Sequence, residues 1–251
     1  SVSNKEGIVD FAEQIVKLGI KIISTGKTAN LLKKNKINVT LVSEITKFPE
    51  MLDGRIKSVH PNIFGGILAD RKNNRHTQEL KKLKIDTIDL VVVNFYPFEE
   101  TVVKRNVKLK EIMEKIDIGG PALARAAAKN YKDVLVVVDP KDYGVVAEKI
   151  KKKKIDENFK SNFAAKSLLH TARYDAVISR YFAEHFIAGG FPEIYNFTFK
   201  KIQDLRYGEN PHEKAAFYKD FWINETCIST AKQLHGKELS YNNILDANDA
   251  F

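Results

Sequence analysis

The feature that most constrains the fold is an alternation of short, β-branched apolar runs with segments of helical periodicity. The apolar runs are residues 20–24, 39–42, 90–95 and 134–138. Their length and continuous hydrophobicity predict strands that are buried on both faces. Helical spacing of apolar residues fills the stretches at 8–16, 78–83, 109–116 and 122–128. Strands that alternate with helices predict an α/β fold with a largely parallel sheet and helices on both of its faces.

A change in the sequence pattern near residue 190 predicts a domain boundary. A long helical pattern runs from Asn158 to Phe186, and the pair Gly189-Gly190 would break it. Beyond the pair, short aromatic strands, the turn-like segment RYGENPH and a final helical pattern at LDANDAF follow one another. We therefore expect two domains, residues 1–190 and residues 191–251. About sixty residues of this kind are marginal for an independent core, so we expect the second domain to be incomplete.

The net charge of +9 raises the possibility of a nucleic-acid binder, but the lysines are spread along the chain. The one dense run, residues 151–154, is expected at the exposed end of a helix. We therefore expect no nucleic-acid partner, and the excess of positive charge suits an anionic small molecule. No apolar run approaches the roughly 20 residues of a membrane span, and no leader is recognisable, so we expect no membrane association and a cytoplasmic location.

Metal-binding patterns are weak in this sequence. Cys227 is the single cysteine, which excludes an internal disulfide framework and a thiolate zinc site, and we expect it to be a small core residue. The six histidines show no spacing typical of metal ligands. We therefore predict no metal site.

Two hydroxyl-rich segments that precede helices predict a phosphate cradle. They are SVSNK at residues 1–5 and STGKTA at residues 24–29. Free N–H groups at a helix start favour an anion, and glycine lets the backbone approach it closely. Each segment taken alone is also typical of an ordinary helix cap. The G-K-T of the second segment is not a P-loop, because Ile22 stands where the first glycine is required.

Three further loops carry side chains suited to catalysis. DGRIKSVHP brings Arg55 and Lys57, NFYPF ends a strand with Tyr96, and DIGGPALARAAAKN places Asp117 twelve residues before Lys129. The alternatives are a surface basic pair and a packed aromatic ring with a solvated tip. Spacing leaves open whether the carboxylate of Asp117 and the ammonium of Lys129 converge.

These segments, in this order, resemble the N-terminal cyclohydrolase domain of the bifunctional AICAR transformylase/IMP cyclohydrolase family. The likeness includes FPEMLDGRIKSVHP, IDIGGPALARAAAKN and HTARYDAVISRYF, and it continues through RYGENPH and LSYNNILDAND into the start of the transformylase domain. The resemblance implies a methylglyoxal-synthase-like α/β domain followed by the truncated start of an α/β transformylase domain. It also implies closure of the purine precursor FAICAR to IMP and water, with no metal or organic cofactor.

The resemblance assigns catalysis to Lys57, Tyr96, Asp117 and Lys129. Lys57 would stabilise the developing oxyanion, and the other three would manage proton transfer, with acid and base unassigned. Substrate-binding positions implied in the first domain are Ser3, Lys5, Thr25, Gly26, Thr28, Arg55, Ser58, Asn94, Gly119 and Gly120. AICAR-binding positions implied in the second domain are Arg206, Tyr207 and Asn243. Lys27 departs from the pattern, because the family commonly has a glycine there.

The resemblance also limits what this chain is expected to do. The family's lysine-histidine pair for formyl transfer from 10-formyltetrahydrofolate would lie beyond Phe251, and homodimers are expected of the full-length parent. Two alternatives keep the fold and change the function: a methylglyoxal-synthase-like lyase and a module that binds a small anionic effector. A nucleic-acid binder is the alternative from a different class.

Overall fold

The computed structural model describes residues 1–251 except residues 105, 190–191, 221–222 and 224. The chain divides into two compact units, Ser1–Ile178 and Ser179–Phe251. This division falls within α10 (Glu157–Phe186), the longest helix of the described chain. The boundary predicted at Gly189-Gly190 lies partly outside the described residues, and each unit is treated separately below.

All four predicted strands of the first unit are present, although each is shorter than its apolar run. In two parallel pairs, β1 (Ile23–Ser24) lies beside β2 (Thr40–Leu41), and β3 (Leu90–Val92) lies beside β4 (Leu135–Val137). A parallel bridge also joins Val2 to Asn94. The second run ends early because α3 (Val42–Thr46) begins at its last residue. The predicted parallel sheet is therefore realised, among the described residues, as two short parallel ladders.

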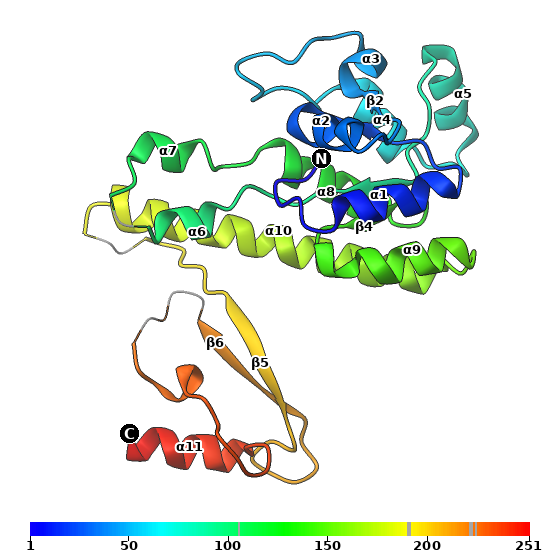
Figure 1. The fold of residues 1–251 in the computed structure, drawn as a ribbon. Coiled ribbons are helices and arrows are strands. Elements are labelled where there is room, and N and C mark those ends of the chain that lie inside the picture. The colour runs from blue at the N-terminus through cyan, green and yellow to red at the C-terminus, as the bar shows by residue number, and fades with distance from the viewer. Residues whose placement is uncertain (105, 190–191, 221–222, 224) are drawn as a thin grey trace. The chain divides into compact units, whose positions relative to one another are not determined.

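Helices connect these strands in the predicted order (Figure 1). They are α1 (Ile8–Lys17), α2 (Gly26–Lys34), α4 (Pro61–Leu68), α5 (Asn74–Leu83), α6 (Phe98–Val102), α7 (Leu109–Met113), α8 (Gly119–Lys129), the 3-10 helix η1 (Pro140–Asp142) and α9 (Tyr143–Lys151). Local chemistry explains the start of α4. His60 Nδ1 accepts a hydrogen bond from Asn62 N at the start of α4, where Pro61 occupies the first helical position.

Both faces of the β3–β4 ladder are buried, as the continuous apolar runs predict. On β4 and the residues beside it, Val136 and Val138 pack with residues of α4 and α8, whereas Leu135 and Val137 pack with residues of α1 and α9. This alternation follows from the two-residue period of a strand. On the second face, the rings of Phe11 and Tyr143 stack with centroids 4.7 Å apart, so α1 and α9 lie side by side (Figure 1). The sheet is thus the middle layer of this unit.

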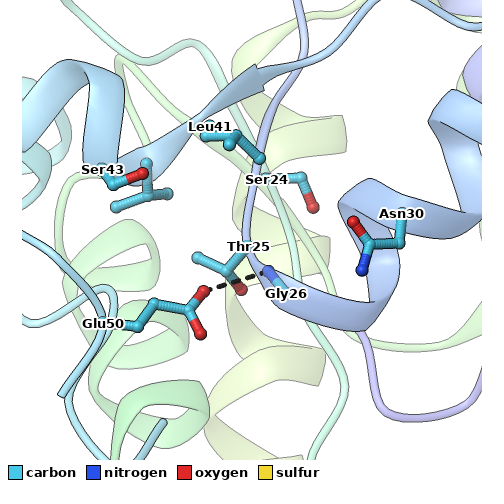
Figure 2. Close-up of a pocket in the computed structure, with 8 residues that line it drawn as sticks. Ser24, Thr25, Gly26, Asn30, Leu41, Ser43 and Glu50 are labelled. Atoms are coloured by element: carbon cyan, nitrogen blue, oxygen red, sulfur yellow. Dashed lines mark hydrogen bonds between the residues drawn. The ribbon is translucent and has the colours of Figure 1, made fainter.

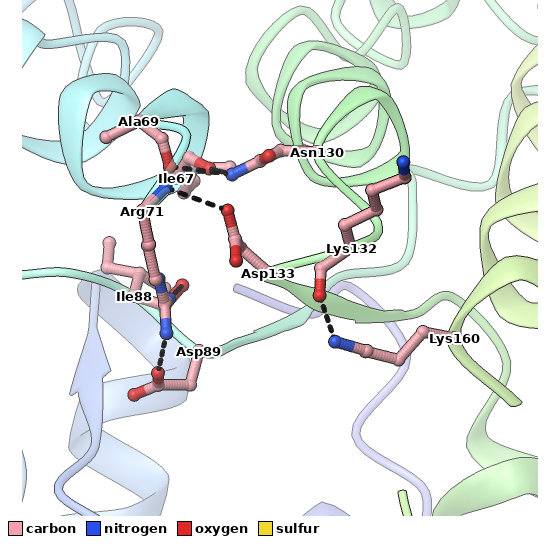
Figure 3. Close-up of polar contacts among 9 residues, drawn as sticks. All are labelled: Ile67, Ala69, Arg71, Ile88, Asp89, Asn130, Lys132, Asp133 and Lys160. Atoms are coloured by element: carbon pink, nitrogen blue, oxygen red, sulfur yellow. Dashed lines mark hydrogen bonds and ion pairs between the residues drawn. The ribbon is translucent and has the colours of Figure 1, made fainter. Parts of the chain in front are cut away.

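The amino ends of β3 and β4 are closed by polar contacts (Figure 3). Asn130, directly after α8, donates from Nδ2 to the carbonyls of Ile67 (2.7 Å) and Ala69 (3.0 Å) at the end of α4. The guanidinium of Arg71 pairs with Asp89 at 2.6 Å. These contacts join segments that are distant in sequence at the amino ends of the two strands, which leaves the opposite edge of the sheet for a ligand.

The second unit is an antiparallel hairpin with short helical segments. It contains β5 (Phe199–Leu205), β6 (Ala215–Asp220), η2 (Ile228–Thr230) and α11 (Tyr241–Ala250). The predicted turn RYGENPH connects the two strands. Cys227 is partly exposed and lies at the start of η2, 3.1 Å from Ser229 Oγ, so the expectation of a core cysteine is wrong. Among the described residues, the three buried apolar clusters consist entirely of residues of the first unit.

Candidate functional site

The two segments predicted to hold phosphate meet beside the carboxyl ends of the strands. Lys5 Nζ donates to Thr28 Oγ1 at 2.7 Å, and Thr28 Oγ1 donates to the carbonyl of Val2 at 3.2 Å. Burial, followed by the charges of Lys57 and Lys27, lowers the pKa of Lys5. Three cationic side chains therefore share one neighbourhood, which favours an anionic ligand.

Asn94 fixes the first of these segments to the end of β3. Its Oδ1 accepts from the backbone N–H groups of Ser3 (2.5 Å) and Asn4 (2.8 Å), and its Nδ2 donates to the carbonyl of Asn4 (3.1 Å). The side chain is buried, with 8% of its surface exposed. The structure therefore gives Asn94 a positioning role, and the substrate contact that the resemblance implies stays a prediction.

Lys57 and Tyr96 form the first part of the predicted catalytic group. The ammonium of Lys57 donates to Tyr96 Oη at 3.2 Å and lies 5.8 Å from the centre of the tyrosine ring. Lys57 stands on the loop between α3 and α4, and Tyr96 stands shortly after β3. A tyrosine hydroxyl that accepts from an ammonium keeps its own proton available for donation.

Asp117 forms the second part, directly before α8. Its Oδ1 accepts from Gly120 N at 2.8 Å. Burial raises the pKa of Asp117, against the lowering effects of the Gly120 and Tyr96 N–H groups and of the Lys57 charge. The pKa of a carboxyl group that is raised in this way moves toward neutrality, where proton transfer is most efficient. The charge of Lys57 and the backbone N–H of Tyr96 therefore both act on the carboxyl group of Asp117.

Two glycines lie where the neighbouring side chains, including a serine, leave almost no room for a Cβ atom. A Cβ on Gly120 would stand 2.6 Å from Asp117 Oδ2 and 2.9 Å from a ring carbon of Phe95. A Cβ on Gly119 would stand 3.1 Å from Oγ of Ser58, which is buried. Glycine is required at residue 120 because the carboxylate and an aromatic ring already fill the space.

Tyr174 is a site residue that the sequence analysis missed. From α10 it accepts a hydrogen bond from Asp117 N at 2.9 Å and donates one to the carbonyl of Lys115 at 2.6 Å. Its ring lies edge-on against Phe95, with centroids 5.1 Å apart. Helical periodicity gave no signal for this role, since the contact joins residues 57 positions apart.

Lys129 does not join the other three predicted catalytic residues. It is the last residue of α8 and is exposed, whereas Asp117 precedes the first residue of that helix. The helix has 11 residues, so its two ends are about 16 Å apart at roughly 1.5 Å per residue. Its neighbour Asn130 is bound to the end of α4 (Figure 3). The glycine turn therefore does not bring Asp117 and Lys129 together within this chain.

Arg55 is engaged by a partner that the sequence did not indicate. Its guanidinium forms an ion pair with Glu114, just after α7. The turn that precedes Arg55 has positive φ angles at Leu52, Asp53 and Gly54, and a bridge joins Met51 to Ile56 across it. This sharp turn presents Arg55 on the same loop as Lys57.

The predicted residues of the second unit are engaged locally. The guanidinium of Arg206 lies 5.6 Å from the ring centre of Tyr207. Asn243 Oδ1 accepts from Ser240 N (3.1 Å) and from Ser240 Oγ (2.9 Å), which caps α11. These contacts stabilise the hairpin and the helix start.

The described residues hold neither a cluster of metal ligands nor a membrane-spanning helix. They contain no cluster of three or more histidine, cysteine, aspartate or glutamate side chains arranged to hold a metal ion. Within the same residues, no helix combines the length and the apolar character needed to span a membrane.

Known proteins match nearly the whole chain. Residues 7–122 match the model of the MGS-like domain, and residues 127–251 match the model of the AICARFT/IMPCHase bienzyme. The crystal structure of ForH is 30% identical and superposes with a TM-score of 0.66, covering 71% of this chain and 92% of that chain. The chain belongs to the AICARFT/IMPCHase bienzyme family. Its fold is α/β, with an MGS-like domain followed by part of the transformylase domain.

Curated relatives extend over this chain and continue beyond it. The "Bifunctional purine biosynthesis protein PurH" of Acetivibrio thermocellus is 53% identical over 100% of this chain and 49% of its own length. The protein of the same name from Thermoanaerobacter sp. (strain X514) is 55% identical, with the same shares covered. The chain thus spans about half the length of these relatives, and it matches their family from its first residues to its last.

Proposed function

We propose that this chain is an IMP cyclohydrolase, which closes the ring of FAICAR to give IMP and water in purine biosynthesis. The contact between the Lys57 ammonium and the Tyr96 hydroxyl, beside the carboxyl group of Asp117, is the observation that carries the proposal. Ring closure requires a cation for a developing oxyanion and groups that move two protons, and these three side chains supply them.

In the proposed reaction, the carboxamide nitrogen of FAICAR attacks the formyl carbon, and a carbon–nitrogen bond forms. Negative charge then develops on the formyl oxygen, where the Lys57 ammonium stabilises it. Asp117 accepts the proton that the nitrogen loses, which suits a carboxylate whose pKa is raised by burial. Tyr96 donates one proton to the formyl oxygen, and Asp117 delivers the proton that it accepted. The carbon–oxygen bond then breaks and water leaves, while the formamide nitrogen forms a carbon–nitrogen double bond and returns its proton to Tyr96. Atoms and charges balance without an added oxidant, reductant or metal.

The substrate's phosphate is assigned to the meeting point of the first two segments. Lys5 and Thr28 already contact each other there, and Thr25 and Gly26 stand at the start of α2. Helix N–H groups and an ammonium together favour a dianion. Arg55 is available to the ligand once it leaves Glu114.

The direct test is turnover of FAICAR by the purified chain, followed as IMP by chromatography. Lys57→Ala and Asp117→Asn should each reduce the rate by roughly a hundredfold or more, since each removes a group that acts on the transition state. Lys34→Ala, at the far end of α2, is the charge-matched control and should leave the rate unchanged. Production of methylglyoxal from dihydroxyacetone phosphate, with no IMP formed, would replace this proposal by the lyase alternative.

We further propose that the longer parent of this chain formylates AICAR with 10-formyltetrahydrofolate as a homodimer in the cytoplasm. Support comes from the family match over residues 127–251 and from the name of the relatives, of which this chain spans about half. The test is formyl transfer by the full-length protein and by this chain. Transfer by the full-length protein alone is the expected result.

A further inference from the structure

One face of α10 reaches the segment that carries Tyr96. His170, Arg173 and Tyr174 share this face, because residues three and four positions apart are neighbours on a helix. Tyr174 contacts the backbone of Asp117, but the proposed mechanism gives no role to His170 or Arg173. Both contact residues 95–99, where the chain passes from β3 through Tyr96 into α6.

Phe95, directly before Tyr96, is held by aromatic rings of α10. Its ring centroid lies 4.6 Å from that of His170 and 5.1 Å from that of Tyr174. Nε2 of His170 is buried and has no hydrogen-bond partner among the described residues. Burial, followed by the charge of Arg173, lowers the pKa of His170, so the ring is uncharged at neutral pH. His170 therefore acts on Phe95 through the packing of its ring.

Glu99, three residues after Tyr96, is held by Arg173. The ion pair between the two side chains joins α10 to α6, which lie side by side (Figure 1). The side chains of Arg173 and Glu99 are 37% and 31% exposed, and ion pairs that are open to solvent contribute little to stability. This ion pair is therefore better suited to fixing the position of a segment than to holding the fold together.

Tyr96 lies between these two anchors. The N–H of Phe98, which is 1% exposed, donates to the carbonyl of Tyr96 at 2.8 Å and closes the turn between them. The Tyr96 hydroxyl accepts from Lys57 Nζ at 3.2 Å, which is already at the long end of the hydrogen-bond range. A small shift of the segment would therefore break this contact.

We propose that His170 and Arg173 are positioning residues, which hold segment 95–99 on α10 so that the Tyr96 hydroxyl meets Lys57 and the reacting oxygen. The inference rests on the proposed function, in which Tyr96 gives a proton to the formyl oxygen. Neither residue touches the reacting atoms. Each acts on Tyr96 through the backbone on one side of it.

The phosphate of the substrate is assigned to a different region of the site. The start of α2 lines a pocket of about 220 Å³ there (Figure 2). Among the described residues that line this pocket, none belongs to α10 or to segment 95–99. Loss of a positioning residue should therefore lower kcat and leave KM nearly unchanged.

The test is steady-state turnover of FAICAR by the 251-residue chain and its variants. Arg173→Met should lower kcat by about tenfold and keep KM within about twofold, because a misplaced group costs rate. In a chain that already carries Tyr96→Phe, the same change should lower kcat by less than about twofold, because the hydroxyl that it positions is gone. Arg180→Met removes another ion pair of α10, with Glu184, and is the matched control that should leave kcat unchanged.

His170 is tested by a pair of substitutions. His170→Ala should lower kcat as Arg173→Met does, whereas His170→Phe should keep the kcat of the parent, because it retains a ring that packs on Phe95. His170→Phe should also keep or raise the melting temperature, since it removes a buried nitrogen without a partner. Equal losses of kcat in the two variants would overturn the packing role of His170.

Two results would overturn the role of Arg173. The first is an equal loss of kcat from Arg173→Met in the parent and in the Tyr96→Phe chain. The second needs no substrate: the nuclear magnetic resonance signal of Tyr96 Cζ, assigned by its absence in Tyr96→Phe, should shift in Arg173→Met and stay in place in Arg180→Met. An unshifted signal in Arg173→Met would contradict the inference, whereas a shifted signal in a parent chain that does not turn over FAICAR would overturn the proposed function alone.

Discussion

Gly120 is the residue at which the site tolerates the least change. A methyl group there would stand 2.6 Å from Asp117 Oδ2 and 2.9 Å from Phe95. Gly120→Ala should therefore displace the carboxyl group, lower the free energy of unfolding by about 1–3 kcal/mol and reduce ring closure strongly. Denaturant unfolding and FAICAR turnover measure the two effects.

Gly144 provides the matched control for this substitution. It lies in α9, and an added Cβ would meet no atom within 4 Å. Gly144→Ala should raise the free energy of unfolding by about 0.5–1 kcal/mol, because alanine favours the helix, and it should leave turnover intact. Equal stability losses in both variants would show that crowding at Asp117 is not the cause.

The carboxyl group of Asp117 should make stability depend on pH. Burial raises its pKa above the ordinary value of 3.8, so folding favours the neutral acid. This contribution is fully present below the unfolded-state pKa and is lost as pH rises through the folded-state pKa. Asp117→Asn should thus melt at a higher temperature than the parent at neutral pH, with a difference that shrinks on acidification. A melting difference that grows toward acid pH would contradict the assigned direction.

The sequence predicted which residues lie in the candidate site better than it predicted which of them contact one another. Lys57 precedes α4, Tyr96 follows β3 and Asp117 precedes α8, and the three lie near one another in the structure, as loops that carry chemistry at one edge of a sheet predict. Spacing left open whether Lys129 meets Asp117, and the helix that begins at Gly119 carries Lys129 away by a fixed rise per residue. Tyr174 was missed because its partner is distant in sequence and only tertiary packing brings the two together.

At the scale of elements, α8 is fixed at both ends by contacts of different purpose. At its start, Tyr174 of α10 binds the backbone of Asp117 and Lys115. After its end, Asn130 binds the last carbonyls of α4 (Figure 3). The first contact positions a proposed catalytic group, whereas the second closes the edge of the sheet far from it.

These two contacts predict the same loss of stability but different effects on catalysis in a pair of variants. Tyr174→Phe leaves a backbone N–H and a carbonyl without their partner, and Asn130→Ala does the same to two carbonyls. Each should lower the free energy of unfolding by about 1–3 kcal/mol. Only Tyr174→Phe should lower kcat and shift its pH profile, because only that contact positions Asp117. Equal kcat values for the two variants would show that Tyr174 acts on stability alone.

The lengths of elements were predicted less well than their order. The apolar run at 39–42 predicts a strand through Val42. In the structure, Val42 begins α3 and packs in the buried cluster that includes residues of α4 and α8. Apolar character is the same for a buried strand and for a buried helix start, so periodicity over four residues cannot separate them. The order of strands and helices was predicted correctly, because the connection between two parallel strands usually contains a helix.

At the scale of the whole molecule, the two units differ in how much apolar surface each buries within itself. All three buried clusters belong to the first unit, together with Lys57, Tyr96 and Asp117. In the second unit, the hairpin and α11 keep large apolar side chains such as Phe199 and Leu245 exposed, at 55% and 46%. Stability of the first unit should therefore depend little on the second.

Removal of the residues after Gly189 tests this independence. The shortened chain keeps all of α10 and each described residue of the proposed mechanism, so FAICAR turnover should stay within about twofold of the parent and the main melting transition should move by only a few degrees. In the parent, hydrogen exchange should be fastest in η2 and α11 and slowest in β3, β4 and α8, because protection follows burial. Loss of turnover in a shortened chain that still melts cooperatively would show that the second unit contributes to the cyclohydrolase site, and the mechanism would then need a residue from beyond Gly189.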